Sequence, residues 1–363
     1  MSRSERHVVF VSPLPPPSGG IATWTEAIRV RGLGDGWRVS IVDTRMRGRS
    51  VADRKSSLLP ELARSARMLG SLLKMLVFDR PDVVHINCSL SEKGIFRDSL
   101  AVAVARLFRV AVVSNLRGNF LPGQRTAFSR WTTAAYRFIF RNSERIVALN
   151  NASRDGVCEL GDFAGVTTVV PNFVDLSAIP EQAELGERRF RVAYVGALAE
   201  SKGVITVLET ATRLPEIEFV LVGDAPGNGD SSPITEMVEK LANVDHVGSV
   251  PHSSALDILA ASDALIFPSH SEGFPNVVAE SMAIGLPVVA SPVGAIPEMI
   301  DDPEGGFLIP HDQIESYVDV IRSLAADRQF ARKLGAHNRD KARDQYSYED
   351  VIAQWRRLYE SLI

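Results

Sequence analysis

The sequence has few of the features that mark secreted, membrane-spanning or metal-binding proteins. Its 363 residues include two cysteines, Cys88 and Cys158, and their spacing is typical of neither a metal site nor a disulfide framework. A reducing compartment is therefore expected. No apolar run approaches the roughly 18 residues of a membrane span, and the run near the N-terminus is too short for a signal peptide. We expect a cytoplasmic protein, either free or peripheral on the inner face of the cell membrane.

What the sequence does contain is an ordinary globular composition with a charge asymmetry. The residues are 45% hydrophobic and 23% charged, and the length suits two domains. The net charge of −4 hides a basic first half. Residues 1–185 carry 25 Lys and Arg against 17 Asp and Glu, whereas residues 186–363 carry 15 against 27. This asymmetry suggests that one half meets an anionic partner.

Apolar runs of strand length alternate with helical patterns along both halves, which indicates βα units and mostly parallel sheets. The runs of the first half read HVVFVS, RVSIVD, DVVHIN, VAVVSN, RIVALN and TTVV. After a polar stretch at 181–189, interpreted as a linker, the second half reads FRVAYVG, IEFVLVG, VDHVG, ALIFPS and LPVVAS. We predict two doubly wound, Rossmann-like α/β domains facing across a cleft, with ligands at the carboxyl ends of the strands.

The stretch 262–300 holds two carboxylates between buried strands. Glu272 lies in a Gly/Pro loop after ALIF, and Glu280 lies inside a helix expected from about 277 to 283. The rest of that helix is apolar, so Glu280 needs polar partners, which sugar hydroxyls can supply. The alternative is that Glu272 is a solvated loop acid and Glu280 a helix-start charge favoured by the helix dipole.

The start of this helix also has the character of an anion site. Asn276 is a residue type that favours the N-cap position. Free amides at a helix start suit an anionic ligand. Pro275 has no N–H, so the expected donors are the amides of Gly273, Phe274, Asn276 and Val277.

The segment SEGFPNVVAE, with PVVAS and GAIPE behind it, resembles the glutamate-x7-glutamate motif of retaining glycosyltransferase family 4, the glycosyl transferases group 1. The resemblance implies a GT-B architecture. It also implies transfer of a sugar from a UDP- or GDP-linked nucleotide sugar to a hydroxyl acceptor. Polysaccharide or glycolipid assembly is the expected setting. Neither a metal nor another cofactor is expected. By resemblance, Glu272 holds hydroxyls of the transferred sugar and Glu280 holds the ribose.

The resemblance covers nearly the whole chain and suggests its domains. Residues 1–180 correspond to an acceptor-binding domain and residues 187–345 to a nucleotide-sugar-binding domain. Residues 346–363 correspond to a closing helix that packs back on the first domain. The acceptor is expected to be a glycan or a lipid-linked molecule, and no nucleic acid is implied.

Other positions of the second half match the family in part. Lys202, followed by a glycine and a helical pattern, matches the lysine that meets the donor diphosphate; judged without the family, it is a lone surface charge. Gly196 belongs to the donor loop, but Ala197 stands where relatives carry an arginine. The backbone around Ser249 and Val250 corresponds to the part that meets the base, without fixing which base.

In the first half, Gly19 and Gly20 precede a helical pattern after a proline run. Such a pair commonly marks only a turn or loop. In the family, however, a glycine-rich loop at this position faces the donor phosphates and the acceptor. Many relatives have a histidine near the end of the strand VAVVSN. The corresponding residue of this chain is Arg117 or, if the segment is aligned differently, Asn115. An arginine can stabilise the charge of the leaving diphosphate or hold an acidic acceptor. We therefore name Glu272, Lys202 and Arg117 as candidate catalytic residues.

Residues 45–80 are rich in arginine and lysine, and apolar residues recur at helical spacing from Leu58 to Leu76. A basic loop beside an amphipathic helix is typical of proteins that bind an anionic membrane surface. A domain helix packed on its sheet, with a solvated basic face, would show the same pattern.

Two rival functions remain open at this point. A GT-B sugar-nucleotide epimerase or phosphorylase would need acid/base groups or a phosphate site that the sequence does not display. A degenerate homologue that binds nucleotide sugar without transferring it, or that acts as a scaffold, would fit the departures at Arg117 and Ala197.

Overall fold

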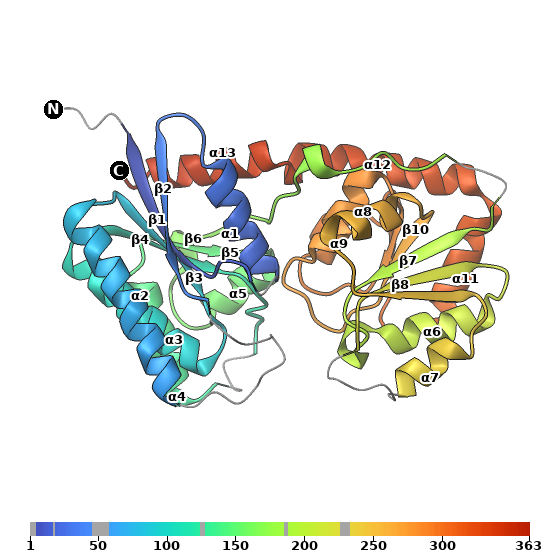
Figure 1. Ribbon diagram of the computed structural model, residues 1–363, viewed down its shortest axis with the longest axis horizontal. Helices are drawn as coiled ribbons and strands as arrows, with labels where there is room; N and C mark the ends of the chain where they lie inside the picture. The colour runs from blue at the N-terminus through green and yellow to red at the C-terminus, as the bar shows by residue number, and fades with distance from the viewer. Residues whose placement is uncertain (1–4, 17–18, 46–57, 124–127, 185–187, 226–232) are drawn as a thin grey trace. The chain divides into compact units, whose positions relative to one another are not determined.

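The computed structural model describes residues 5–16, 19–45, 58–123, 128–184, 188–225 and 233–363. The chain forms two compact units (Figure 1). Unit 1 comprises residues 1–172 and 352–363, and unit 2 comprises residues 173–351. The change between them falls earlier in the chain than the polar stretch 181–189.

Unit 1 is built on a parallel sheet of six strands in the order β2-β1-β3-β4-β5-β6. The strands are β1 (Arg6–Ser12), β2 (Trp37–Asp43), β3 (Val83–Cys88), β4 (Ala111–Leu116), β5 (Arg145–Ala148) and β6 (Thr167–Val169). β3 is buried along its whole length, and β1 is buried except at its first residue. Continuous apolar runs of this kind are expected where helices cover both faces of a sheet.

The helices of unit 1 connect these strands in βα order. They are α1 (Gly20–Arg31), α2 (Leu58–Phe78), α3 (Glu92–Leu107), α4 (Arg130–Arg141), α5 (Asn151–Cys158) and the short 3-10 helix η2 (Ala164–Val166). Met68, Leu72 and Leu76 of α2 are buried in the unit's core together with residues of α3 and the sheet. The apolar spacing predicted for residues 58–76 therefore belongs in part to an ordinary domain helix.

Unit 2 has a second parallel sheet of six strands, in the order β12-β11-β10-β7-β8-β9. Its strands are β7 (Arg191–Val195), β8 (Glu218–Val222), β9 (Val244–Gly248), β10 (Ala264–Phe267), β11 (Val288–Ala290) and β12 (Gly306–Leu308). β12 is absent from the sequence prediction. It is only a three-residue edge strand, paired with β11 from Val288↔Gly306 to Ala290↔Leu308. The two sheets with their helices confirm the predicted α/β class.

The helices of unit 2 surround its sheet in the same alternating order. They are η3 (Leu176–Ala178), η4 (Glu200–Lys202), α6 (Val204–Arg213), α7 (Pro233–Glu239), α8 (His252–Ala260), α9 (Asn276–Ile284), α10 (Ile296–Met299), α11 (Ile314–Ala326) and α12 (Arg328–Tyr346). In the sheet, β10 lies next to β7, so the loops that follow these two strands emerge at the same edge.

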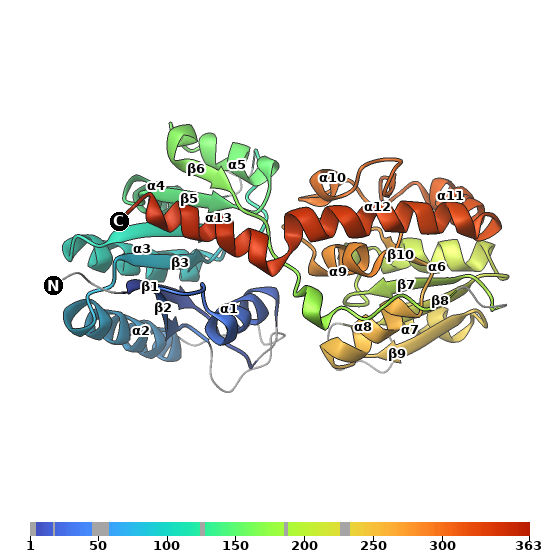
Figure 2. The ribbon, with the colours of Figure 1, turned by 90° about the horizontal axis from the view of Figure 1, so that it is seen from above.

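The last helix, α13 (Tyr348–Glu360), follows α12 directly (Figure 2), and its part from Ile352 onward belongs to unit 1. The Tyr359 hydroxyl shares a 2.7 Å hydrogen bond with Nδ1 of His85 on β3, and the Trp355 ring packs edge-on against Trp24 of α1. His85 is fully buried, and burial lowers its pKa to about 3, so its imidazole is neutral. His85, at the carboxyl half of β3, is therefore a core residue of unit 1.

Within the described ranges, every helix is too short or too polar to cross a membrane.

Candidate functional site

Two loops at the carboxyl edge of the unit 2 sheet bring Lys202 and Glu272 together. Lys202 follows β7 and Glu272 follows β10, and the two strands are neighbours. The Lys202 Nζ lies 2.7 Å from Oε1 of Glu272. The Ser269 hydroxyl donates a second hydrogen bond, of 2.8 Å, to the same oxygen. The lysine side chain is 36% exposed and the glutamate 13%, so the carboxylate is fixed while its cation stays accessible.

Glycines allow the backbone of this edge to close up around Glu272. Gly203 has φ +77°, and a Cβ built there would lie 2.0 Å from the Pro268 carbonyl oxygen. Gly294 has φ +58°, and a Cβ there would lie 1.9 Å from the carbonyl oxygen of Glu272 itself. A side chain at either position would push the two loops apart, because both the contact and the left-handed backbone favour glycine.

The helix α9 begins at Asn276 rather than after it. Pro275 occupies the N-cap position, with φ −76° and ψ 111°, and its carbonyl accepts from the amides of Val278 and Ala279. The prediction of Asn276 as the N-cap is therefore wrong by one residue. The fixed φ of proline is compatible with the cap position. Pro275 therefore takes that position, and the helix begins one residue earlier than the N-cap preference of asparagine suggests. The predicted donor Gly273 accepts a 3.0 Å hydrogen bond from the Ala295 amide through its carbonyl.

Phe274 and Val277, two further predicted amide donors, lie just before α9 and in its first turn. Phe274 is buried, and its ring packs edge-on against Tyr346 at 5.5 Å. The ring therefore anchors the loop, and only the backbone of Phe274 remains available to contact a ligand. Val277 is the second residue of α9, where amides have no partner within the helix.

Glu280 lies on the second turn of α9, where it contacts a histidine that the sequence prediction missed. The Nε2 of His252, the first residue of α8, lies 2.8 Å from Oε1 of Glu280. The Glu280 carboxylate raises the pKa of His252. The glutamate side chain is 16% exposed and the imidazole 61%. Nothing local in the sequence singles out His252, because its position depends on how α8 packs against α9.

The loop after β7 is held by Tyr194, a second residue that the sequence did not suggest. Its buried hydroxyl donates a 2.7 Å hydrogen bond to the Ala197 carbonyl. Burial is the main cause that raises the pKa of Tyr194, and the Glu272 charge adds to it. The amide of Gly196 donates to the Val222 carbonyl of β8. Ala197 is exposed and carries no charge, so Lys202 is the cation that this loop presents.

Ser249 and Val250 follow β9 at the far end of the same sheet edge. The amide of Ser249 donates a 3.0 Å hydrogen bond to Oδ1 of Asp224, which follows β8. Of the backbone groups at Ser249, the carbonyl is then the one left to meet a ligand while this bond is in place.

Gly19, Gly20 and Arg117 belong to unit 1. Gly19 is the N-cap of α1, and neither a capping side chain nor an acidic residue occupies the first turn. Its φ of −179° is extended, and a Cβ there would have no atom of the described residues within 4 Å.

Arg117 follows β4 at the carboxyl edge of the unit 1 sheet and is only 9% exposed. Its guanidinium lies 4.4 Å from the centre of the Trp24 ring on α1. Its Nε and Nη1 have no hydrogen-bond partner among the residues that the structure describes. Asn115, the residue of the alternative alignment, donates through Nδ2 to Oδ1 of Asn87 and faces the buried network around His85.

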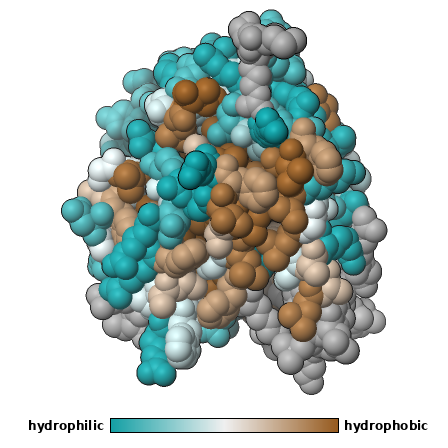
Figure 3. Space-filling view, turned by 90° about the vertical axis from the view of Figure 1, so that its left-hand side faces the viewer, coloured by the Kyte–Doolittle hydropathy of each residue, from teal (hydrophilic) through white to brown (hydrophobic). Residues whose placement is uncertain are grey.

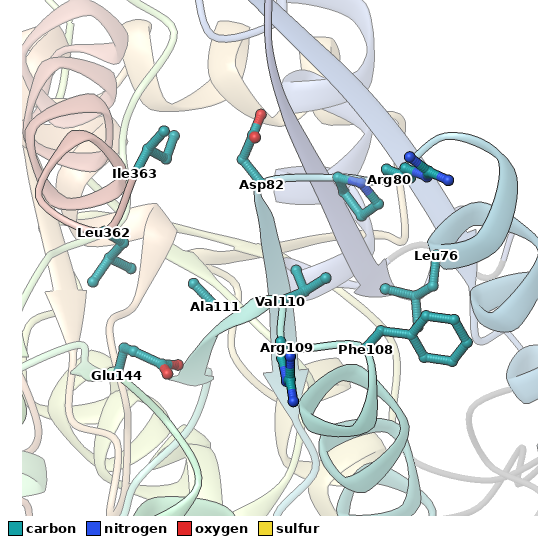
Figure 4. Close-up of a pocket in the computed structure, with 11 residues that line it drawn as sticks. Leu76, Arg80, Asp82, Phe108, Arg109, Val110, Ala111, Glu144, Leu362 and Ile363 are labelled. Atoms are coloured by element: carbon teal, nitrogen blue, oxygen red, sulfur yellow. The ribbon is translucent and has the colours of Figure 1, made fainter.

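A pocket of about 710 Å³ lies at the other end of the unit 1 sheet, where β3 and β4 begin (Figure 4). Its lining combines apolar side chains, among them Phe108 and Ile363, with the charged residues Arg80, Arg109 and Glu144. None of the predicted site residues lines it.

The described residues contain no group of three or more His, Cys, Asp and Glu side chains that is placed to hold a metal ion.

Two parallel-sheet units, with a lysine–glutamate pair and a second glutamate at the carboxyl edge of one of them, are the arrangement expected of a glycosyltransferase of the GT-B type. Comparison with known families agrees. Residues 18–178 match Glycosyltransferase Family 4, and residues 177–341 match Glycosyl transferases group 1. The chain belongs to this family of glycosyltransferases.

Its relatives include several mycobacterial enzymes. Glycogen synthase of Mycobacterium tuberculosis is 26% identical over 307 residues, which cover 80% of this chain and 72% of that protein. Alpha-maltose-1-phosphate synthase of Mycolicibacterium smegmatis is 31% identical over 195 residues, half of each chain.

Solved structures show the same fold across the whole chain. Sucrose-phosphate synthase from Thermosynechococcus elongatus superposes with a TM-score of 0.77 at 18% identity and covers 99% of both chains. HepE from Anabaena, in complex with UDP and glucose, has a TM-score of 0.75 at 19% identity and covers 98% of this chain and 100% of its own.

Proposed function

We propose that the protein is a retaining glycosyltransferase that uses a nucleotide-sugar donor, bound by unit 2, and a hydroxyl acceptor, bound by unit 1. The observation that carries the proposal is the Lys202–Glu272 pair, at 2.7 Å, together with Glu280 on the adjoining helix. One cation and two largely buried carboxylates at one sheet edge suit a ligand with a diphosphate and several hydroxyls.

Each residue then has a distinct role. The Lys202 ammonium neutralises the leaving diphosphate without a metal or other cofactor. Glu272 accepts hydrogen bonds from hydroxyls of the transferred sugar, and Glu280 accepts them from the ribose. The acceptor hydroxyl attacks from the side of the leaving group and gives its proton to a diphosphate oxygen, so the chain contributes positioning and electrostatic stabilisation.

The relatives support a setting in polysaccharide or glycolipid assembly, since one of them is a glycogen synthase. The HepE structure with UDP and glucose supports a UDP-linked donor over a GDP-linked one.

The stereochemistry of the product tests the proposal. Wild-type protein is incubated with UDP-glucose or GDP-mannose and a panel of glycan acceptors, and the new anomeric bond is assigned by NMR. An α-linked product from these α-linked donors is expected. A β-linked product would contradict retention, and hydrolysis or epimerisation without transfer would contradict the glycosyltransferase assignment.

We also propose that unit 1 binds an anionic membrane surface, which would bring the enzyme to a lipid-linked acceptor. Most of the predicted basic loop, residues 46–57, lies outside the described residues. In α2 the outer face exposes Leu73, Val77 and Phe78 beside the exposed Lys74 and Arg80. Apolar residues flanked by cations are typical of an interfacial helix.

The neighbouring helix α3 extends this exposed apolar surface. Phe96, Leu100 and Leu107 are 46%, 51% and 79% exposed. Figure 3 shows apolar side chains gathered in the middle of the face of unit 1 that it displays. An exposed patch of this kind commonly marks an interaction surface.

Co-sedimentation with phosphatidylglycerol vesicles tests the membrane proposal. Wild type is expected to sediment at low salt and to be released as salt shortens the Debye length from about 10 Å at 0.1 M to about 3 Å at 1 M. Val77→Ser and Phe78→Ser together should weaken sedimentation, whereas Val247→Ser, which alters an exposed valine of unit 2, should not. Wild type that stays in the supernatant at low salt would contradict the proposal.

A further inference from the structure

The pocket of about 710 Å³ beside the starts of β3 and β4 lies entirely within unit 1. It is at the edge of the sheet where the strands begin, whereas the residues assigned to substrates lie where strands end. Its volume is in the range of small-molecule sites. The lining comes from the ends of α2 and α3, the loop before β5 and the residues after α13 (Figure 4). The proposed sugar transfer uses none of these residues.

The two carboxylates in the lining serve the fold. Oδ2 of Asp82 accepts a 2.8 Å hydrogen bond from the His7 amide at the start of β1. Oε2 of Glu144 accepts a 2.7 Å hydrogen bond from the Val112 amide of β4, and its Oε1 forms an ion pair with Arg106. Both carboxylates therefore hold the beginnings of strands in place, and Arg106 offsets the charge of Glu144.

Two arginines of the lining have an unusual backbone conformation. Among the described residues, Arg80 (φ 45°) and Arg109 (φ 58°) are the two residues other than glycine with positive φ. Each follows the end of a helix, α2 or α3, where the left-handed conformation favours glycine. Residues strained in this way commonly occur at ligand-binding sites. In the described part of the chain, no carboxylate forms an ion pair with Arg109, so its guanidinium is available to an anion.

Large apolar side chains protrude beside these arginines. Phe78 and Leu107, the last residues of α2 and α3, are 76% and 79% exposed, and Ile363 is 58% exposed. Figure 1 places the C-terminal end of the chain on the left-hand side of unit 1, and Figure 3, which views that side, shows apolar side chains gathered in its middle. A small soluble anion would leave these groups in water, whereas the acyl region of a lipid would cover them.

We propose that this pocket binds the headgroup of a single anionic phospholipid. The guanidinium groups of Arg80 and Arg109 bind the phosphate oxygens through their forked donors. Phe78 and Leu107 enter the acyl region beside the headgroup. The proposal deepens the membrane contact proposed for unit 1 and rests on it for its role in the cell, because it assigns that contact to one lipid site at the ends of α2 and α3.

Monomeric dihexanoylphosphatidylglycerol, kept below its micelle-forming concentration, is the probe, and its binding to the full-length chain is measured by calorimetry. One lipid should bind per chain. Glycerophosphate, which lacks the acyl chains, and zwitterionic dihexanoylphosphatidylcholine should each bind at least about tenfold more weakly. Equal binding of glycerophosphate would assign the pocket to a soluble phosphate and would overturn the proposal, as would absence of phosphatidylglycerol binding.

Glycine variants separate lipid binding from a structural role. Arg80→Gly and Arg109→Gly should each weaken phosphatidylglycerol binding about tenfold. Their Tm should stay at or above that of wild type, because glycine suits the left-handed backbone. The control Arg154→Gln removes a cation of α5 whose side chain is 42% exposed, and it should bind lipid like wild type. Unchanged affinity in both glycine variants, or weaker binding together with a lower Tm, would contradict the assignment of the arginines.

Vesicle co-sedimentation distinguishes this proposal from the membrane contact that it deepens. Vesicle binding without binding of the monomeric lipid would keep the membrane contact and overturn the lipid pocket. Binding of one monomeric lipid per chain without vesicle sedimentation would support the pocket and refute the membrane contact. Light scattering without lipid tests the remaining occupant: a dimer that Leu107→Ser dissociates would assign the pocket to a second copy of the chain and overturn the proposal.

Discussion

Replacing Glu280 by glutamine isolates the proposed ribose contact. The substitution keeps the size of the side chain but exchanges one acceptor oxygen for a donating amide. His252 lies 2.8 Å from Oε1 of Glu280, so the second oxygen is the one available to a hydroxyl. Losing a hydrogen bond to a charged group costs about 1.5–3 kcal/mol, which weakens binding roughly ten- to a hundred-fold.

The effect of Glu280→Gln should depend on pH because of His252, whose pKa falls toward its ordinary value in the variant once the carboxylate that raises it is gone. Below that pKa the imidazolium has only donors and claims the amide oxygen, which leaves the NH₂ group facing the ribose. Above it, the neutral ring can accept from the NH₂ group, and the oxygen is free to turn toward the ligand. The affinity loss should therefore be larger at pH 6 than at pH 8.5.

Calorimetry with UDP, GDP and ADP measures this without involving the sugar. Asp319→Asn is the matched control, since it removes an exposed carboxylate of the same unit. Unchanged affinity in a folded Glu280→Gln variant would refute the ribose assignment. A wild type that binds none of the three nucleotides would refute the donor site in unit 2.

Three further outcomes follow from the same geometry. Glu272→Ala should lower kcat more than it weakens nucleotide affinity, as steady-state kinetics and calorimetry can compare, because Glu272 is assigned to the sugar. In NMR titrations, the His252 pKa should lie above 6.5 and fall in Glu280→Gln; the pair's stabilisation is present below the unfolded pKa and lost as pH rises through the folded one. Gly203→Ala should destabilise by at least about 2 kcal/mol in urea unfolding, whereas Gly70→Ala, in open space on a helix, should stabilise by up to about 1 kcal/mol.

The strands could be predicted where burial on both faces leaves a continuous apolar run. β3 and β10, buried at every position, are examples. β12 could not be predicted, because three residues after a charged turn are too few to show a strand's hydrophobic pattern. Only their pairing with β11 makes them a strand. The start of α9 was misplaced by one residue, since two residue types suited to a helix start, Pro275 and Asn276, are adjacent.

The candidate site depended more on resemblance than on local pattern. Lys202 and Glu272 are 70 positions apart, and only the adjacency of β7 and β10 brings them to 2.7 Å. His252 and Tyr194 were missed because a helix-start histidine and a strand tyrosine are indistinguishable from surface and core residues. His85 could not be assigned from its strand, because its partner Tyr359 lies 274 positions later.

The contacts between Lys202 and Glu272 leave both side chains able to bind the proposed nucleotide-sugar donor. Both described contacts of Glu272 go to Oε1, so Oε2 keeps its acceptor sites for sugar hydroxyls. Lys202 has three N–H donors and gives one to Glu272, which leaves two for diphosphate oxygens. A donor can therefore bind without first separating the pair, and the lysine already lies beside the carboxylate that orients the sugar. Since Ala197 supplies no second cation in this loop, Lys202→Met should weaken nucleoside diphosphate binding more than Glu272→Ala does.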